Sequence, residues 1–377
     1  MSSRRDFLRK LSCVGLAGVN ARWPSGSSIQ ASSELRSVPD SRFIALDRNE
    51  NPYGPSAKVL DAIRRASVDV GRYPREAVEL SDRIAQVHKI DPAKVLLGAG
   101  STEILRVACD AFLGKGRQLI QSSPTYTEME SYARSTGAAV ISEPLTRNFE
   151  FDVDKMLTHR GSGLVYLCNP NNPTGTITPR KRLESFLTRL PASHKILIDE
   201  AYQEFCPHTT NSSSFLDDSI DDDRIIVTRS FSLAYALAGL RLGFGVGSPK
   251  LVDQMRPFVT QNSINAVAVA GALAALNDAD GLAETVRRNA DARQEFANQC
   301  TSRSLKPLDS HTNFLAFNIY NPANLIIRYF RENNILIAPV SLSWDTYIRV
   351  SLGKPDEMRM FWEIWDKAPI DKSSIPH

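Results

Sequence analysis

Residues 195–202 have the sequence KILIDEAY, in which a short apolar strand ends on an aspartate. Two similar apolar runs, 164–168 and 224–228, lie on either side of it in the chain, and helical patterns such as 179–189 separate the runs. Apolar strands that alternate with helices are typical of a mainly parallel sheet covered by helices on both faces. The sequence therefore predicts an α/β protein built around such a sheet.

The 377 residues are enough for one large α/β domain and a smaller companion. After about residue 250 a long helical region leads into two strand-like runs, which predict a smaller α+β domain. We expect five consecutive segments: an export leader at 1–21, a serine-rich linker at 22–39, an N-terminal arm at 40–55, a large domain at 56–255 and a small domain at 256–370.

The N-terminus resembles a twin-arginine export leader. Residues 3–8 have the sequence SRRDFL, and a short, weakly apolar run follows at 11–19. Such leaders are recognised by the twin-arginine export machinery, which predicts a bacterial protein that is periplasmic or secreted. The alternative interpretation is a basic tail with no address function.

The formal charge of +3 belongs to this leader. Residues 1–21 hold four basic residues and one acidic residue, so 41 basic and 41 acidic residues remain after its removal. A neutral mature chain gives no support for a nucleic-acid or membrane-surface partner, and no apolar run is long enough to span a membrane. The cysteines after the leader are dispersed, which indicates core positions and no metal site.

Five polar or glycine-rich segments are candidates for a functional site. They are NENPYGP at 49–55, GAGSTE at 98–103, NPNNPTG at 169–175, the aspartate that ends the KILIDEAY strand, and SFSLAYALAGLRLG at 230–243. The segment at 98–103 joins a strand to a helix, where backbone N–H groups favour an anion. A carboxylate at the end of a buried strand, Asp199, needs a partner because an unpaired buried charge is costly.

Taken in order, these segments and Arg72-Tyr73-Pro74 resemble the class I/II aminotransferases of the fold type I pyridoxal-phosphate superfamily. The resemblance extends from Asp47 to about Ala368 and is greatest to the histidinol-phosphate aminotransferase branch. It implies the large and small domains described above, a homodimer, and pyridoxal 5′-phosphate or pyridoxamine phosphate as cofactor. It also implies a substrate that is an amino acid or a related amine.

The resemblance assigns site residues by position. For the cofactor it implies Asp199 at the pyridine nitrogen, Asn172 and Tyr202 at the phenolic oxygen, Tyr126 against the ring, Ser101, Thr102, Ser230, Ser232 and Arg241 at the phosphate, and Tyr73 from the neighbouring subunit. For the substrate it implies Arg349 as a clamp on a carboxylate, with Asn51 and Asn313 close by.

Leu233 departs from the family pattern. It stands eight residues before Arg241, where the family has the lysine that forms the Schiff base and moves the substrate proton. Leucine has no nitrogen and no titratable group, so ordinary lysine-dependent transamination is not expected. Three explanations of Leu233 remain open. The residue is a laboratory substitution, or the chain is a natural homologue that kept the pocket and changed its chemistry, or the chain uses no cofactor.

Two residues are candidates for a replacement base, and one further position bears on the substrate. Tyr235 and His311 lie near the expected site, although core packing and a surface position are the simpler interpretations of them. Ala338 stands where the histidinol-phosphate branch is expected to have an arginine, which disfavours a phosphorylated substrate.

Two functional hypotheses result. The first is an exported aminotransferase-like protein that holds its cofactor non-covalently and acts on an amino acid or an amine with a carboxylate. The second is a non-catalytic periplasmic binding protein for an amino acid or a B6 vitamer. Reversible binding of the cofactor is expected under the first hypothesis.

Overall fold

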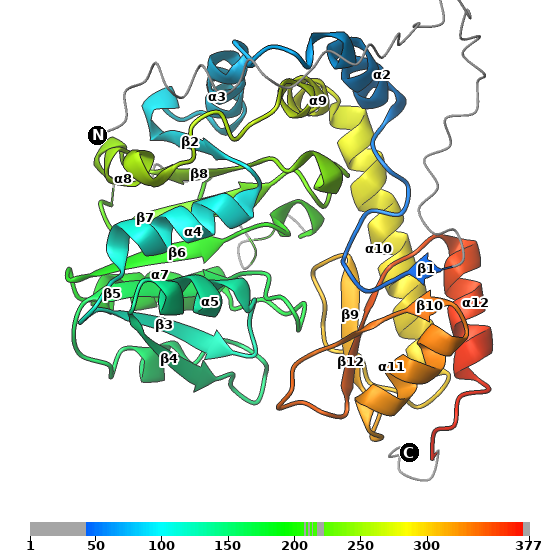
Figure 1. The fold of residues 1–377 in the computed structure, drawn as a ribbon. Helices are drawn as coiled ribbons and strands as arrows, with labels where there is room; N and C mark the ends of the chain where they lie inside the picture. The colour runs from blue at the N-terminus through cyan, green and yellow to red at the C-terminus, as the bar shows by residue number, and fades with distance from the viewer. Residues whose placement is uncertain (1–42, 207–208, 210–211, 213, 217–221, 372–377) are drawn as a thin grey trace, which may run out of the picture. The chain divides into compact units, whose positions relative to one another are not determined.

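A seven-stranded sheet forms the larger part of the fold (Figure 1). The computed structural model describes residues 43–206, 209, 212, 214–216 and 222–371, so the predicted leader and linker lie outside the described residues. In spatial order the strands are β2 (Val95–Gly98), β8 (Gly243–Gly247), β7 (Ile225–Ser230), β6 (His194–Asp199), β5 (Gly163–Cys168), β3 (Gln118–Ser123) and β4 (Ala139–Pro144). Only β8 runs against the other strands of this sheet.

Helices cover both faces of this sheet, because successive side chains of a strand point to opposite sides. On β6, Leu197 lies in one core cluster with residues of α4, α5 and α8, whereas Ile196 and Ile198 lie in another with residues of α2, α3, α7 and α9. The helices are α2 (Ala57–Ala66), α3 (Ala77–His88), α4 (Ser101–Phe112), α5 (Glu128–Ser135), α6 (Val153–Met156), α7 (Arg180–Arg189), α8 (Pro249–Met255) and α9 (Ala266–Leu276). The two-sided packing of a mainly parallel sheet is confirmed.

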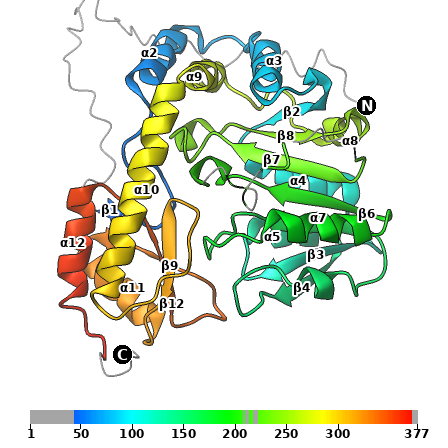
Figure 2. The same cartoon turned by 180° about the vertical axis from the view of Figure 1, so that it is seen from behind.

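A second, smaller set of strands and helices follows in the chain (Figure 2). Its antiparallel sheet has the order β11 (Ala338–Pro339), β12 (Tyr347–Ser351), β9 (Phe314–Asn318), and a parallel pair joins β1 (Ile44–Ala45) to β10 (Ile335–Leu336). The helices α10 (Ala279–Thr301), α11 (Ala323–Glu332) and α12 (Pro355–Trp365) pack on these strands through an aromatic core. Short 3-10 helices complete the described elements: η1 (Ser67–Asp69), η2 (Pro92–Lys94), η3 (Gln203–Phe205), η4 (Ala238–Leu240) and η5 (Arg256–Phe258).

The predicted domain boundary at residues 255–256 stays a prediction. The helix α9 follows that boundary, yet it packs against α2, and its Ala272 lies in the core cluster beneath the larger sheet.

Among the described helices, none alone has the length and apolar character needed to cross a membrane, although the bent pair α9 and α10 meets that test when taken together.

The glycine-rich strand β8 is absent from the sequence prediction because its residues have no strand-like pattern. Its glycines allow the helix α4 to approach the sheet closely. A side chain at Gly245 would lie 2.8 Å from Ile104, and one at Gly243 would collide with the backbone nitrogen of Ser101. These glycines therefore set the position of the N-terminus of α4 against the sheet.

Candidate functional site

The carboxyl ends of the central parallel strands carry the candidate site. Cys168 ends β5, Asp199 ends β6 and Ser230 ends β7, and β5, β6 and β7 are neighbours in the sheet. Ligands of open α/β sheets bind at this edge, where loops leave the strands side by side. The predicted segments at 169–175 and 230–243 both begin there.

Asp199 is a buried carboxylate, with only 4 % of its surface exposed. The hydroxyl of Tyr166 donates to its Oδ2 over 2.9 Å, and the Ala201 N–H donates to its Oδ1 over 3.2 Å. Burial raises the pKa of Asp199 to about 6, even though both hydrogen bonds favour the ionised form. Within the described residues Asp199 has no ion pair, so its charge is available to a cationic group of a ligand.

A second cluster gathers donors at the N-terminus of α4. The Arg241 guanidinium donates to the hydroxyl oxygens of Thr102 (3.3 Å) and Ser232 (3.4 Å). Gly100 precedes the helix with a φ of 82°, and a Cβ there would lie 2.5 Å from Arg241 Nη2. A guanidinium, hydroxyl groups and the N–H groups of the first helical turn together make a site for an anion such as a phosphate. The predicted phosphate residue Ser230 lies at its edge, where its buried hydroxyl accepts the Ser232 N–H over 3.1 Å.

Leu233 lies next to this anion site and is 9 % exposed. Its side chain belongs to an apolar cluster with Tyr202 and Phe314, together with Ala201, Phe205 and Ala234. The Tyr202 hydroxyl is the only titratable group in that cluster of described residues. Position 233 therefore presents hydrocarbon where the resemblance implies an amine.

Arg349, on β12, faces the residues of the larger sheet. It donates to Asn172 Oδ1 over 2.7 Å and to the Asp47 backbone oxygen over 2.6 Å, and its guanidinium lies 5.4 Å from the centre of the Phe314 ring. Burial lowers the pKa of Arg349, and its Nε has no partner among the described residues. A half-buried guanidinium whose Nε is buried and unused is suited to a carboxylate ligand.

Asn49 connects these parts of the site. Its side-chain amide donates to the Tyr202 hydroxyl over 2.8 Å, its backbone N–H donates to the Ser351 hydroxyl, and its backbone oxygen accepts from Asn313. Two buried side-chain atoms of the predicted substrate residues, Asn51 Nδ2 and Asn313 Oδ1, have no partner in the part of the chain that the structure describes. Sequence reasoning places Asn49 in a motif but gives it no role, and it gives none to Tyr166.

Tyr126 lies between the two ends of this arrangement. It packs beside the core cluster of α4 and α5, the charge of Asp199 contributes to the raised pKa of its hydroxyl, and Tyr126 in turn raises the pKa of Arg349. Burial raises its pKa to about 12, so the phenol is neutral at physiological pH. The adjacent Thr125 hydroxyl donates to Asn171 over 2.8 Å, which joins the segment of Tyr126 to the segment at 169–175.

Three predicted residues lie apart from these contacts. Tyr73 is 74 % exposed, after η1. Tyr235 packs on Phe231 with ring centres 5.1 Å apart, and burial raises its pKa, which suits a packing role better than that of a base. Burial lowers the pKa of His311, whose ring nitrogen lies 3.6 Å from the Asp309 carboxylate, while its backbone N–H donates to the Gly175 oxygen.

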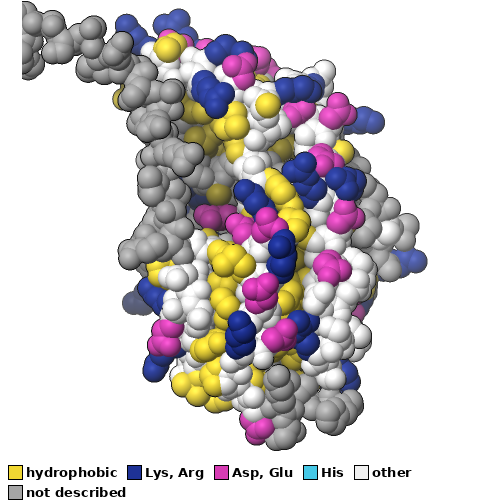
Figure 3. All heavy atoms as spheres, turned by 90° about the vertical axis from the view of Figure 1, so that its right-hand side faces the viewer, with side chains coloured by type: hydrophobic (Ala, Val, Ile, Leu, Met, Phe, Trp, Pro, Cys, Tyr) yellow, Lys and Arg dark blue, Asp and Glu magenta, His cyan; other side chains and the backbone are white. Residues whose placement is uncertain are grey.

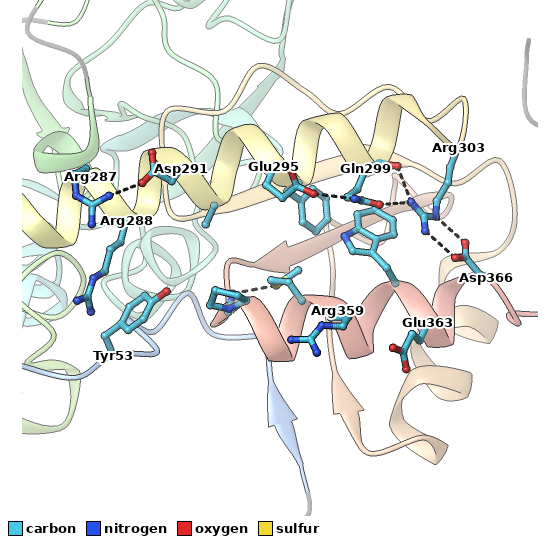
Figure 4. A pocket seen from close by; sticks show the side chains of 16 residues that line it. Tyr53, Arg287, Arg288, Asp291, Glu295, Gln299, Arg303, Arg359, Glu363 and Asp366 are labelled. Atoms are coloured by element: carbon cyan, nitrogen blue, oxygen red, sulfur yellow. Dashed lines mark hydrogen bonds and ion pairs between the residues drawn. The ribbon is translucent and has the colours of Figure 1, made fainter.

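A large groove lies elsewhere, between α10 and α12 (Figure 4), with a volume of about 690 Å³. Its wall includes Trp362 and Met358, and polar side chains such as Arg303 and Asp366 pair along its rim. Figure 3 shows the face of the molecule that carries these helices, where hydrophobic side chains lie in bands between charged ones. Tyr53 of the candidate segment 49–55 lines this groove, but none of the residues to which the resemblance gives a cofactor or substrate role does. Within the described residues, no group of three or more His, Cys, Asp or Glu is placed to hold a metal ion.

A mainly parallel sheet covered by helices on both faces, with Asp199 and the Arg241 anion site at one edge, is the architecture of the fold type I pyridoxal-phosphate aminotransferases. The chain belongs to the aminotransferase class I and II family, whose model matches residues 41–364.

Similar proteins come from the histidinol-phosphate branch. A histidinol-phosphate aminotransferase of Methylobacillus flagellatus is 32 % identical over 328 residues, which cover 86 % of this chain and 88 % of that protein. The structure of a putative histidinol-phosphate aminotransferase from Erwinia carotovora atroseptica has a TM-score of 0.79 at 31 % identity, covering 86 % of this chain and 94 % of that one. A histidinol-phosphate aminotransferase from Sinorhizobium meliloti, solved in complex with pyridoxal-5′-phosphate, has a TM-score of 0.81 at 26 % identity, covering 90 % of this chain and all of that one.

Proposed function

We propose that this chain binds pyridoxal phosphate or pyridoxamine phosphate without a covalent bond and acts as an aminotransferase-like protein on an amino acid or an amine with a carboxylate. The observation that carries the proposal is the buried Asp199, which has no cationic partner among the described residues, at the same strand edge as the Arg241 anion site. A cofactor with a pyridinium nitrogen and a phosphate matches both. When bound, the group supplies a ring that withdraws electrons from the carbon next to the substrate nitrogen.

The chain's own residues have distinct tasks in this proposal. Asp199 is assigned to keep the ring nitrogen protonated, and the Asn172 and Tyr202 side chains are assigned to hydrogen-bond the phenolic oxygen. Arg241, Thr102 and Ser232 hold the phosphate. Tyr126, Ser101 and Ser230 complete the pocket, and Tyr73 is assigned to the phosphate of a neighbouring subunit.

The carboxylate of the substrate is assigned to Arg349, and the strand register supports a single negative charge there. The residues opposite Arg349 on both neighbouring strands are alanines, Ala338 on β11 and Ala316 on β9. Directly opposed residues share a face of the sheet, so no second cation stands beside the guanidinium on these strands. One guanidinium balances a carboxylate, whereas a phosphate monoester would keep an uncompensated charge. We therefore propose an unphosphorylated substrate.

The test of cofactor binding uses absorption spectroscopy, dialysis and borohydride. Pyridoxal phosphate added to the purified chain is expected to change the spectrum, to be removed by dialysis, and not to be fixed to the chain by borohydride. The spectrum is then followed with a panel of amino acids. A borohydride-stable adduct on any lysine would contradict non-covalent binding.

A second candidate function is a binding protein for an amino acid or a B6 vitamer, without catalysis. The environment of Leu233 favours it, because the cluster around that side chain offers only the Tyr202 hydroxyl as a proton carrier, and burial raises the pKa of this group well above its usual range. Binding of an amine with no turnover would support this candidate. Transamination after the change Leu233→Lys would show that the scaffold is otherwise complete.

We also propose a homodimer, in which Tyr73 reaches the partner. Apolar side chains stand exposed in this region, with Val68 at 82 % and Val70 at 66 %, and they lie near a groove lined by Tyr73 and by Val269 of α9. Sedimentation or light scattering is expected to give the mass of a dimer. The change Val68→Asp at this surface is expected to yield monomers, and Leu342→Asp, at a fully exposed leucine between β11 and β12, is the matched control.

Export through the twin-arginine route is the last part of the proposal. It is supported by the sequence SRRDFL at residues 3–8. Replacing Arg4 and Arg5 by lysine is expected to keep the protein in the cytoplasm of the producing bacterium, as measured by cell fractionation. Unchanged export of this double variant would refute the assignment.

A further inference from the structure

Two arginines, the exposed Arg241 and the half-buried Arg349, are linked to Leu233 through neighbouring residues. Arg241 contacts Ser232, the residue before Leu233 in the chain. On the other side, the Leu233 side chain shares a cluster with Phe314, and the Arg349 guanidinium lies 5.4 Å from the centre of that ring. The hydrocarbon of Leu233 thus lies along a continuous series of contacts between an anion site for a phosphate and a cation for a carboxylate.

Each half of this arrangement leaves polar groups unsatisfied when it is filled alone. A phosphorylated ring on Arg241 would leave the Arg349 Nε without a partner. An amino acid on Arg349 alone would bring its ammonium group toward the apolar cluster of Leu233, and a buried ammonium without a partner is strongly unfavourable. Both costs are avoided by a single molecule that carries the phosphate and the carboxylate and whose nitrogen is bonded to the ring component, so that no free ammonium group is buried.

We infer that the ligand selected by this site is the conjugate of pyridoxal phosphate with the α-amino group of an amino acid, so that each component strengthens the binding of the other. This inference rests on the proposed function. The conjugate is an imine that forms in solution: the neutral amine attacks the aldehyde carbon, a C–N bond forms, the C–O bond breaks, and both hydrogens of the nitrogen leave with the oxygen as water. The condensation involves no oxidation or reduction.

Leu233 makes the coupling possible because it does not compete for the aldehyde. An amine at position 233 would bind the aldehyde itself and make cofactor binding independent of the amino acid. With leucine there, the amino acid supplies the only nitrogen, and its carboxylate adds the Arg349 contact to the Arg241 contact within one molecule. Joining two anchored groups in one ligand raises its affinity by about 10²–10⁴ over either part when the geometry allows both contacts. The coupling is reciprocal by thermodynamic necessity.

The experiment measures binding of pyridoxal phosphate to the purified full chain by calorimetry, with and without saturating L-alanine. Alanine is the probe because it has the shared amino and carboxylate groups and a minimal side chain. The expected result is a dissociation constant at least about tenfold lower with alanine. The stable secondary amine made by reducing the pyridoxal phosphate–alanine conjugate is expected to bind more tightly than either component.

Chemical and protein controls separate this inference from the proposed function. Pyridoxine 5′-phosphate has an alcohol in place of the aldehyde and cannot condense, so alanine is expected to change its affinity by less than about twofold. The change Leu233→Met keeps an apolar side chain and is expected to keep the coupling, whereas Leu233→Lys is expected to reduce it. Circular dichroism verifies that both variants are folded.

Three outcomes overturn the inference: equal affinity for pyridoxal phosphate with and without alanine, the same coupling with pyridoxine phosphate, or undiminished coupling in the lysine variant. In each of these cases cofactor binding, and with it the proposed function, still stands. If neither pyridoxal phosphate nor the reduced conjugate binds at all, the proposed function fails as well.

Discussion

Replacing Asp199 by asparagine is expected to stabilise the ligand-free protein at neutral pH and to weaken its binding of pyridoxal phosphate. Asparagine has nearly the same shape as aspartate and carries no charge. Its oxygen can accept the Ala201 N–H, and its amide can donate to the Tyr166 hydroxyl oxygen, so both present contacts keep a partner.

The size of the effect follows from the pKa of Asp199, which burial raises from 3.8 to about 6. Because the folded state holds this proton more tightly than the unfolded chain, ionisation of Asp199 reduces stability as pH rises from about 4 to about 6. That difference in pKa between the unfolded and folded states corresponds to about 3 kcal/mol of stability lost at pH 7. The asparagine variant avoids that loss, less the cost of rearranged hydrogen bonds, which is about 1 kcal/mol.

The assay is urea denaturation of cofactor-free parent and variant at pH 7 and at pH 4.5. At pH 7 the variant is expected to be more stable by about 2 kcal/mol, and at pH 4.5 the difference is expected to shrink toward zero. Comparing the two proteins at each pH cancels the titration of all other groups. A variant that is less stable than the parent at pH 7, or a gain that is the same at both pH values, would refute the reasoning. Calorimetry with pyridoxal phosphate is expected to show the opposite order, with weaker binding by the variant.

Three further changes test the anion site, a buried ion pair between residues of β7 and the segment after β6, and the substrate assignment. Gly100→Ala places a Cβ 2.5 Å from Arg241 Nη2 and is expected to weaken pyridoxal phosphate binding at least about tenfold, while binding of unphosphorylated pyridoxal, the control in the same titration, changes little. Arg229→Met leaves the buried Glu200 without its 2.9 Å ion pair and is expected to cost about 3–5 kcal/mol in denaturation, part of which a second change, Glu200→Met, restores. Ala338→Arg adds a cation opposite Arg349 and is expected to raise affinity for a phosphorylated amine about tenfold, measured by calorimetry against its unphosphorylated analogue; unchanged preference would contradict the substrate assignment.

The strands of the larger sheet could be predicted because burial on both faces gives them continuously apolar sequences. The run 195–198 lies within β6 and the run 164–168 lies within β5. The strand β8 could not be predicted in this way, because Gly243 and Gly245 are required by the close approach of α4 and carry no strand preference of their own. Such a requirement is set by a tertiary contact and has no local pattern.

The site could be predicted in part, since polar residues that follow buried strands meet at one edge of a parallel sheet. Asp199 and Arg241 are of this kind. The roles of Asn49 and Tyr166 depend on partners far away in the chain, because Asn49 bonds Tyr202 and Tyr166 bonds Asp199 across neighbouring strands. A buried tyrosine hydroxyl needs a partner, but the sequence does not say which one.

The described chain contains several groups that lower its own stability, and these groups converge on one place. Burial raises the pKa of Asp199 and lowers that of Arg349, and the Arg349 Nε and Asn313 Oδ1 have no partners. Apolar replacements at such positions are often neutral or stabilising, so folding alone gives no reason to keep them. A ligand with a cationic ring nitrogen and a carboxylate would satisfy these groups together. Their presence around Leu233 therefore argues that ligand binding, independent of a covalent bond to the chain, is what this site serves.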